Sequence, residues 1–461
     1  MQEQLNIKSL LVLIAISVGI SLLFFPGLWL TPEQDKAAGL VIITITLLAT
    51  SFIPEYLTTL LFFLLAMLFH VAPDYIIFAG FQSTALWLVF GGLVVGVAVM
   101  STGLGQRVAN KLAIHLEGSY AQLITGVTLA GAMFAFIMPS AMGRVVLLVP
   151  IMLALANHFG FKSGSNGRIG LVLAALLGSS MPAFFILPAN VPNMILAGMA
   201  ESQLGLYVLF GEYLLLHFPI LGIAKIGLII LIILWLYPDK PVVIQTETKT
   251  ISNPMSKSEQ ILAMILVILL LLWMTDFIHH VSPAWIALGG AIFLLLPYVA
   301  IVNTEQFNTK INYGSLFFVA GIIGLGSLIK YSGLGLALGD YFILHLPLNP
   351  ETPFFNYISI AFVSTFLGLF TTLPGIPAIM TPLTPEIVQE TGFSTKSVLM
   401  LQTLGFSTMF FPYQAPYIVV ALSLAKENMT IILKPLFIIA GVSLFILFPI
   451  NYLWWQLLGW I

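Results

Sequence analysis

Long apolar runs dominate this sequence, and most of them have the length that a helix needs to cross a lipid bilayer. A spanning helix takes roughly 20 mostly apolar residues, because each residue adds about 1.5 Å along the helix axis. Backbone N–H and C=O groups find no water in lipid, so each segment must satisfy them internally, as a helix does. With ragged ends, the runs cover residues 10–29, 38–53, 56–72, 84–101, 169–200, 206–236, 259–276, 282–301, 314–331, 396–421 and 431–459. We therefore predict an all-α membrane protein with about 11 transmembrane helices.

The composition supports this prediction. Charged side chains make up 7% of the chain and hydrophobic ones 59%, with a mean hydropathy of +1.07. A soluble domain carries about 25% charged residues, so most of this surface must face the lipid bilayer. The net charge of -2 and the lack of a basic run give no sign of a nucleic-acid partner. The sequence has no cysteine, which excludes disulfides, thiolate metal sites and thiol nucleophiles.

Two further apolar stretches, near residues 120–157 and 355–389, are interrupted in the middle. The interruptions read MPSAMG at 138–143 and TTLPGIP at 371–377. Each half is too short to cross the bilayer, so we interpret both stretches as re-entrant hairpins, which enter and leave on the same side. Irregular backbone at membrane depth is tolerated only where protein or water satisfies it. Both interruptions are therefore candidate functional positions.

The two halves of the chain resemble each other. Residues 86–116 align without gaps on residues 316–346, with matching glycines at 91/321, 96/326 and 103/333 and a matching His-Leu pair at 115–116/345–346. Each half also carries a proline-flanked break after its hairpin, PANVP at 188–192 and PYQAP at 412–416. We therefore predict a duplication. It comprises an N-terminal span (1–37), repeat 1 (38–237), a cytoplasmic linker (238–258) and repeat 2 (259–461).

The distribution of basic residues predicts the orientation. With the N-terminus in the cytoplasm, ten lysines and arginines fall in inner loops and three in outer loops. Because basic loops stay on the cytoplasmic side, we expect a cytoplasmic N-terminus and, after eleven crossings, an external C-terminus in the inner membrane. An odd number of crossings per repeat gives the two repeats opposite orientations. Such inverted-topology repeats are typical of secondary transporters.

The paired interruptions predict the binding site. A helix N-terminus exposes unpaired N–H groups that bind an anion, and the helix C-termini at the same breaks expose carbonyls that suit Na⁺. The alternative is that Pro and Gly only kink packed helices, whose Ser, Thr and Asn side chains bond to neighbouring helices. We predict substrate contacts from Ser140, Arg144, Asn190, Pro192, Asn193, Thr371, Thr372, Gln414 and Pro416, and cation contacts from Ser140, Asn190, Thr371, Thr372 and Gln414.

The phrases ALWLVFGGLVVGVAVMSTGLGQRVA and LPANVPN, together with the order of spans and hairpins, resemble the divalent anion–sodium symporter family. The resemblance covers nearly the whole chain in organisation. It implies transport of dicarboxylates, citrate or sulfate, Na⁺ as the coupling ion, a homodimer, and a transport domain that moves as an elevator. In that family each hairpin tip carries a Ser-Asn-Thr motif. Here the tips hold PSAMGR at 139–144 and LPGIP at 373–377, with Ser140, Thr371 and Thr372 as the nearest hydroxyl-bearing equivalents.

Arg144 lies inside an apolar run just past the first tip, where an ionised side chain costs several kcal/mol unless it is paired or hydrated. Its guanidinium either clamps an oxyanion or replaces a bound Na⁺, or it snorkels to the interface or pairs with a carboxylate. We interpret Lys225, inside the sixth span, and Glu212, near its start, as side chains that pair or snorkel.

These observations predict a secondary transporter for a small anion that works by alternating access. An H⁺-coupled or Na⁺-independent transporter or exporter of the wider ion transporter superfamily is the alternative within this class. A membrane-embedded enzyme would need clustered His, Asp, Glu or Ser nucleophiles near the spans, and the sequence offers no such set. We therefore expect no enzyme activity and no cofactor beyond the coupling ion.

Overall fold

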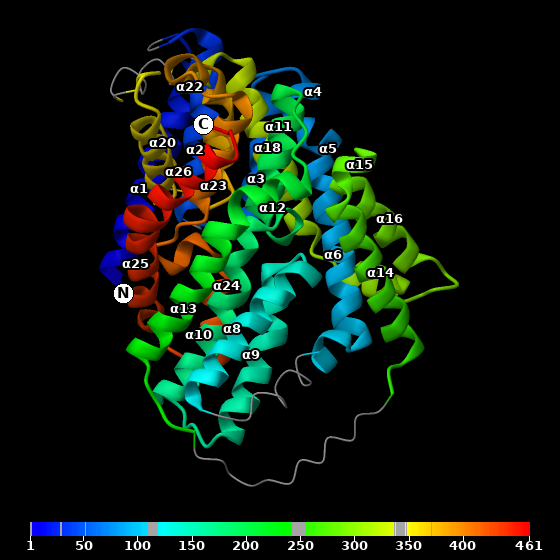
Figure 1. The fold of residues 1–461 in the computed structure, drawn as a ribbon. Helices are drawn as coiled ribbons and strands as arrows, with labels where there is room; N and C mark the ends of the chain where they lie inside the picture. The colour runs from blue at the N-terminus through cyan, green and yellow to red at the C-terminus, as the bar shows by residue number, and fades with distance from the viewer. Residues whose placement is uncertain are drawn as a thin grey trace.

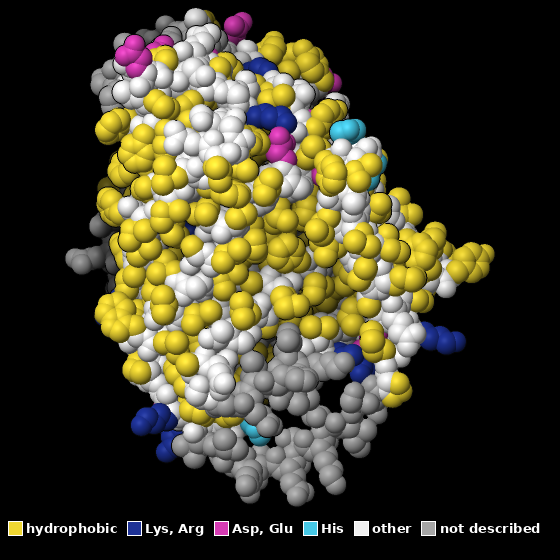
Figure 2. Space-filling model, in the orientation of Figure 1, with side chains coloured by type: hydrophobic (Ala, Val, Ile, Leu, Met, Phe, Trp, Pro, Cys, Tyr) yellow, Lys and Arg dark blue, Asp and Glu magenta, His cyan; other side chains and the backbone are white. Residues whose placement is uncertain are grey.

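A computed structural model of the protein describes residues 2–27, 30–50, 52–108, 119–241, 254–335, 337, 346, 348–369 and 371–461, with the side chains of residues 2–9, 11 and 49 left out. Across these ranges the chain forms helices and no strand. Hydrophobic side chains cover the middle of the visible face, and charged side chains gather toward its two ends (Figure 2). This distribution is expected where the middle faces lipid and the ends face water.

Apolar helices account for most of the described chain. Eight of them are long and apolar enough to cross a membrane, and five shorter apolar helices accompany them. In two predicted runs that contain Pro, the helix departs locally from α-helical geometry. These runs contain π-helical segments, η3 (Phe218–Gly222), which includes Pro219, and η7 (Ser443–Leu447), which ends two residues before Pro449. The prediction of an all-α membrane protein is confirmed.

The helices of the first half appear in the predicted order, and each predicted interruption separates two helices. They are α1 (Gln2–Phe24), α2 (Pro32–Thr50), α3 (Glu55–Leu68), α4 (Asp74–Ile77), α5 (Ala79–Gln82), α6 (Thr84–Thr102), α8 (Tyr120–Ile137), α9 (Ala141–His158), α10 (Asn166–Ser180), α11 (Val191–Leu204), α12 (Phe210–His217) and α13 (Ile223–Leu236). The first hairpin thus consists of α8 and α9, and the first broken helix of α10 and α11.

The second half repeats this order. Its helices are α14 (Lys257–Met274), α15 (Asp276–His279), α16 (Pro283–Leu295), α17 (Thr304–Lys310), α18 (Tyr313–Tyr331), α20 (Pro353–Leu367), α21 (Gly375–Met380), α22 (Thr384–Thr391), α23 (Thr395–Phe406), α24 (Pro416–Ala425), α25 (Leu433–Val442) and α26 (Phe448–Leu457). The second hairpin consists of α20 and the α21–α22 arm, and the second broken helix of α23 and α24.

The glycines matched between the halves occupy corresponding contacts. A Cβ atom on Gly91 of α6 would lie 2.7 Å from the backbone of Ala287 in α16, and one on Gly321 of α18 would lie 2.4 Å from the side chain of Thr59 in α3. Gly103 and Gly333 both adopt left-handed backbone, with φ of +79° and +71°, which is the helix-ending conformation that glycine favours. The aligned residues 109–118 and 338–345, including both histidines, lie outside the described residues.

Each hairpin packs against the broken helix of the other half. Helix α9 contacts α24, and α21 contacts α11, while the first arms α8 and α20 contact α10 and α23 of their own halves. The α8–α9 hairpin lies in the lower half of the view and α20 and α22 lie near the top (Figure 1). The two halves are therefore built alike and interlock at the centre of the molecule.

Candidate functional site

Both broken helices are interrupted by irregular turns that carry prolines. Two 3₁₀ turns, η1 (Pro182–Phe185) and η2 (Leu187–Ala189), separate α10 from α11. A third, η5 (Pro412–Gln414), precedes α24. Because proline lacks an N–H and fixes φ, it interrupts one helix and suits the first turn of the next. The chain therefore starts a new helix inside the protein at each break.

A cavity of about 380 Å³ lies where the breaks meet. Both hairpin tips and both broken helices line it, through residues 138–143, 190–192 and 194, 373–374 and 414–417. Its volume is near the lower end of the range for small-molecule sites. Five of the predicted site residues line this cavity: Ser140, Asn190, Pro192, Gln414 and Pro416.

Helix N-termini surround the cavity. Ser140 caps α9, its hydroxyl accepting from the Gly143 N–H at 3.1 Å, and the Asn190 carboxamide oxygen accepts from the Val191 N–H at 3.2 Å at the start of α11. Helix α24 begins at Pro416, on the same cavity. The first turns of these helices carry partial positive charge, so the cavity favours an anion without needing a basic side chain on its wall.

Gln414 holds the second break together. Its Oε1 accepts from the Phe410 and Phe411 N–H groups at 2.8 and 2.9 Å, and its Nε2 donates to the Gly368 carbonyl at 2.5 Å. One buried amide therefore joins the broken helix to the end of α20. The Asn190 Nδ2, by contrast, is buried without a hydrogen-bond partner among the described residues, which leaves a donor available at the cavity wall.

Arg144 is fully buried and does not line the cavity. Its Nη1 donates to the Met138 carbonyl at 2.5 Å and to the Ala189 carbonyl at 3.1 Å, and its Nε and Nη2 have no partner among the described residues. The expectation of snorkelling or of pairing with a carboxylate is wrong. The guanidinium instead lies behind the first tip and binds backbone oxygens.

Thr371, Thr372 and Asn193 are buried and also lie outside the cavity lining. Within the described residues, both threonine hydroxyls and the Asn193 Oδ1 have no hydrogen-bond partner, while the Asn193 Nδ2 donates to the Ala183 and Ile186 carbonyls at 2.9 Å. Neutral oxygens without protein partners are the ligand type that a hard cation takes. All three of these buried oxygens lack a protein partner among the described residues.

Two other polar residues, Lys225 and Glu212, were expected to pair or snorkel, and within the described residues only Glu212 forms an ion pair. Lys225 is fully buried and does not snorkel. Its Nζ donates to the Ser407 carbonyl at 2.8 Å, and Glu212 forms an ion pair with Lys396 at 2.9 Å. Lys225 therefore caps the C-terminal end of α23.

The sequence reasoning also missed part of the cavity wall. Glu55, Lys310, Asn312 and Ser315 line the cavity from α3, α17 and the start of α18. These residues lie in loops and helix ends remote from the breaks along the chain. For Lys310, Asn312 and Ser315 the one available signal was their position just before the aligned glycine-rich segment of repeat 2, and Glu55 had no such signal.

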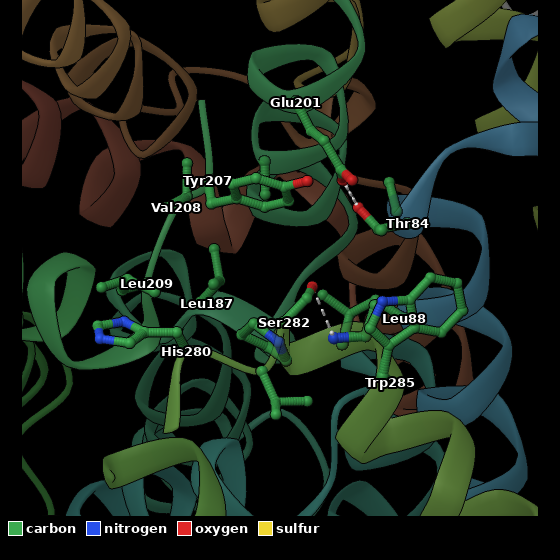
Figure 3. Close-up of a pocket in the computed structure, with 15 residues that line it drawn as sticks. Thr84, Leu88, Leu187, Glu201, Tyr207, Val208, Leu209, His280, Ser282 and Trp285 are labelled. Carbon is green, nitrogen blue, oxygen red and sulfur yellow. Dashed lines mark hydrogen bonds between the residues drawn. The ribbon is translucent and has the colours of Figure 1, made fainter. Parts of the chain in front are cut away.

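A second cavity, of about 290 Å³, lies between α6, α11 and the start of α16. Figure 3 shows the Thr84 hydroxyl pointing at the Glu201 carboxylate, to which it donates a hydrogen bond. Glu201 and Tyr207 also line a neighbouring cavity of about 680 Å³. No predicted site residue lines either cavity, so the cavity at the breaks is the candidate site.

Known proteins give an independent comparison. A family model described as the sodium:sulfate symporter transmembrane region matches residues 4–461. A membrane protein of Cupriavidus necator is 26% identical over 83% of this chain and 77% of its own length. The sodium-dependent dicarboxylate transporter SdcS of Staphylococcus saprophyticus is 23% identical over 87% of this chain and 79% of its own.

Two further similarities cover most of the chain. The chloroplastic dicarboxylate transporter 2 of Spinacia oleracea is 22% identical over 98% of this chain and 83% of its own length. The crystal structure of the Alcanivorax borkumensis YdaH transporter matches with a TM-score of 0.54 and 18% identity, over 83% of this chain and 87% of that one, which shows a shared fold. This integral membrane protein therefore belongs to the sodium:sulfate symporter family, whose members are transporters and not enzymes.

Proposed function

We propose that this protein is a secondary active transporter that carries small dianions, a dicarboxylate or sulfate, with Na⁺ as the coupling ion. The observation that carries the proposal is the cavity of about 380 Å³ at the meeting point of two hairpin tips and two broken helices. Paired interruptions of this kind mark the substrate site in transporters built from repeats. The family description supports sodium and sulfate, and the names of the SdcS and spinach relatives support a dicarboxylate.

The anion binds in front of the helix N-termini in this proposal. Ser140 and Asn190 supply a hydroxyl and a free amide donor, Gln414 fixes the opposite wall, and Pro192 and Pro416 shape it. Arg144 contributes its positive charge from behind the first tip. Asn193, Thr371 and Thr372, which do not line the cavity, supply oxygens for Na⁺.

Alternating access follows an elevator path in this proposal. The contacts of α9 with α24 and of α11 with α21 tie the hairpins and broken helices into one body. That body moves against a frame that includes α3, α6, α16 and α18. We further propose that the protein is a homodimer of inverted repeats in the inner membrane, with its N-terminus in the cytoplasm.

Uptake into proteoliposomes tests the transport proposal. Purified protein is reconstituted, and labelled succinate, citrate and sulfate are supplied with an inward Na⁺ gradient, with an inward H⁺ gradient or with choline alone. We expect the Na⁺ gradient to drive accumulation of at least one of these anions. A lack of uptake of all three under every gradient would contradict the proposal.

The position of Arg144 favours a second candidate, a Na⁺-independent anion exchanger, because its guanidinium already bonds to the carbonyls at the first tip. The exchanger predicts rapid uptake only into vesicles preloaded with unlabelled anion, with no response to Na⁺. The same vesicles, with and without preloading, therefore distinguish symport from exchange.

A further inference from the structure

The C-terminal ends of two helical segments of repeat 1 converge on one nitrogen atom. Met138 is the C-cap residue of helix α8 and Ala189 ends η2, and both carbonyls accept from the Arg144 Nη1, at 2.5 and 3.1 Å. Such carbonyls carry partial negative charge, and in broken membrane helices they form cation sites. The Arg144 guanidinium therefore occupies the position at which repeat 1 would otherwise bind a metal cation.

The carbonyl oxygens are the negative groups that balance this charge. Arg144 is fully buried, and among the described residues no carboxylate lies within ion-pair distance of it. A buried charge without a carboxylate needs compensation from backbone dipoles. Met138 and Ala189 give the guanidinium the kind of compensation that they would give to an alkali-metal ion.

The second hairpin tip, residues 371–377, carries no charged side chain in the place of Arg144. The buried ammonium near the second broken helix, Lys225, binds Ser407 at the end of α23 instead. The Gly368 carbonyl, at the end of α20, accepts from the neutral amide of Gln414. The hydroxyls of Thr371 and Thr372, which are 1% and 3% exposed, have no partner among the described residues. The second hairpin tip therefore offers neutral oxygens to a cation, whereas Arg144 already occupies the first tip.

We infer that Arg144 is the permanent cation of repeat 1, and that transport is coupled to a single Na⁺ ion, bound in repeat 2 at Thr371 and Thr372. The inference rests on the proposed function. Arg144 moves with the protein in both directions and adds nothing to the charge carried per cycle. One Na⁺ travelling with a dianion leaves one net negative charge to cross the membrane.

A Na⁺ titration of anion uptake at constant ionic strength, with choline replacing Na⁺, tests the stoichiometry. We expect a Hill coefficient of about one. The isosteric variants Thr371→Val and Thr372→Val should each raise the Na⁺ concentration for half-maximal uptake about tenfold, through loss of an oxygen ligand. Ser140→Ala should weaken anion binding without changing the Na⁺ half-saturation. Arg168→Ala, which removes a positive charge of the same half away from the breaks, is the matched control and should change neither.

The membrane potential gives a second readout. With valinomycin and an inward K⁺ gradient the vesicle interior becomes positive, and sulfate uptake should become faster, because the loaded carrier brings in net negative charge. Two Na⁺ ions per sulfate would make uptake insensitive to the potential. Insensitivity, or stimulation by an interior-negative potential, would overturn the inference.

Thermal unfolding of the purified protein measures Na⁺ binding without transport. Na⁺ should raise the melting temperature of the wild-type protein and of Arg144→Lys, and the rise should be lost in Thr371→Val and Thr372→Val. Two outcomes would overturn the inference and leave the proposed function standing. The first is Na⁺-driven uptake with a Hill coefficient near two. The second is a melting response to Na⁺ that is lost in Ser140→Ala but kept in the threonine variants. Absence of anion uptake, with the predicted melting response intact, would instead refute the proposed function.

Discussion

The Gln414 side chain donates to the Gly368 carbonyl at 2.5 Å, and this contact joins the second broken helix to the second hairpin. The two residues are 46 positions apart in the sequence. Because the same amide accepts from two N–H groups of its own break, its orientation is fixed from both sides. The part of the cavity wall that the second break forms therefore depends on one neutral side chain.

The variant Gln414→Glu keeps the size of this side chain, removes its donor and adds a negative charge. We expect the KM for the anion to rise about tenfold or more, because a carboxylate now faces the substrate and the Gly368 carbonyl loses its partner. Anion uptake at a series of concentrations measures the change. Gln456→Glu on α26, whose amide donates to the Tyr452 hydroxyl, is the control, and an equal rise in KM there would contradict a local effect.

Arg144 variants separate charge from geometry. Arg144→Lys keeps the positive charge, and Arg144→Gln keeps a donor for the Met138 and Ala189 carbonyls without the charge. We expect Arg144→Gln to weaken binding of divalent anions more than that of monovalent anions, with a loss of about tenfold or more in kcat/KM, because buried charge acts strongly at low dielectric. Arg144→Lys should retain most of the preference for divalent anions. Equal losses for both anion classes in Arg144→Gln would show that the residue has only a structural role.

The sequence alone predicted the interruptions well, because Pro and Gly at membrane depth leave few alternatives to a broken helix. It predicted side-chain directions less well. Ser140 and Gln414 face the cavity, whereas Arg144 and Thr371 lie behind it. Which way a residue points at a break depends on how the 3₁₀ turns rotate the chain. That rotation is set by packing against the other half, which no local pattern records.

Buried polar pairs were the hardest feature to predict. Lys225 bonds to Ser407, 182 positions away, and Glu212 pairs with Lys396, 184 positions away. The sequence indicated that Lys225 and Glu212 pair or snorkel, but it named no partner, because long-range contacts decide both. The same limit explains why Glu55 and Lys310 were missed at the cavity.

Close helix packing at a glycine gives a stability test. A Cβ atom on Gly178 of α10 would lie 2.8 Å from the backbone oxygen of Thr128 in α8. Gly178→Ala should therefore force the hairpin away from the broken helix, at a cost of about 1–3 kcal/mol. The melting temperature and the anion uptake rate should both fall. Gly227→Ala is the matched control, since a Cβ there meets nothing within 4 Å, and it should leave stability unchanged or raise it by roughly 0.5–1 kcal/mol.

The predicted orientation can be tested directly because the sequence has no cysteine. Each single-cysteine variant then carries one reactive thiol, and a membrane-impermeant maleimide labels it only from the side it faces. In intact cells we expect labelling of Glu33→Cys and Glu351→Cys, whose side chains are exposed and fall in the predicted outer loops. Lys162→Cys and Lys240→Cys, exposed in the predicted inner loops, should react only after the membrane is permeabilised. The buried variant Ala174→Cys is the control and should stay unlabelled in both conditions. If the two lysine positions react in intact cells and the two glutamate positions react only after permeabilisation, the N-terminus lies outside.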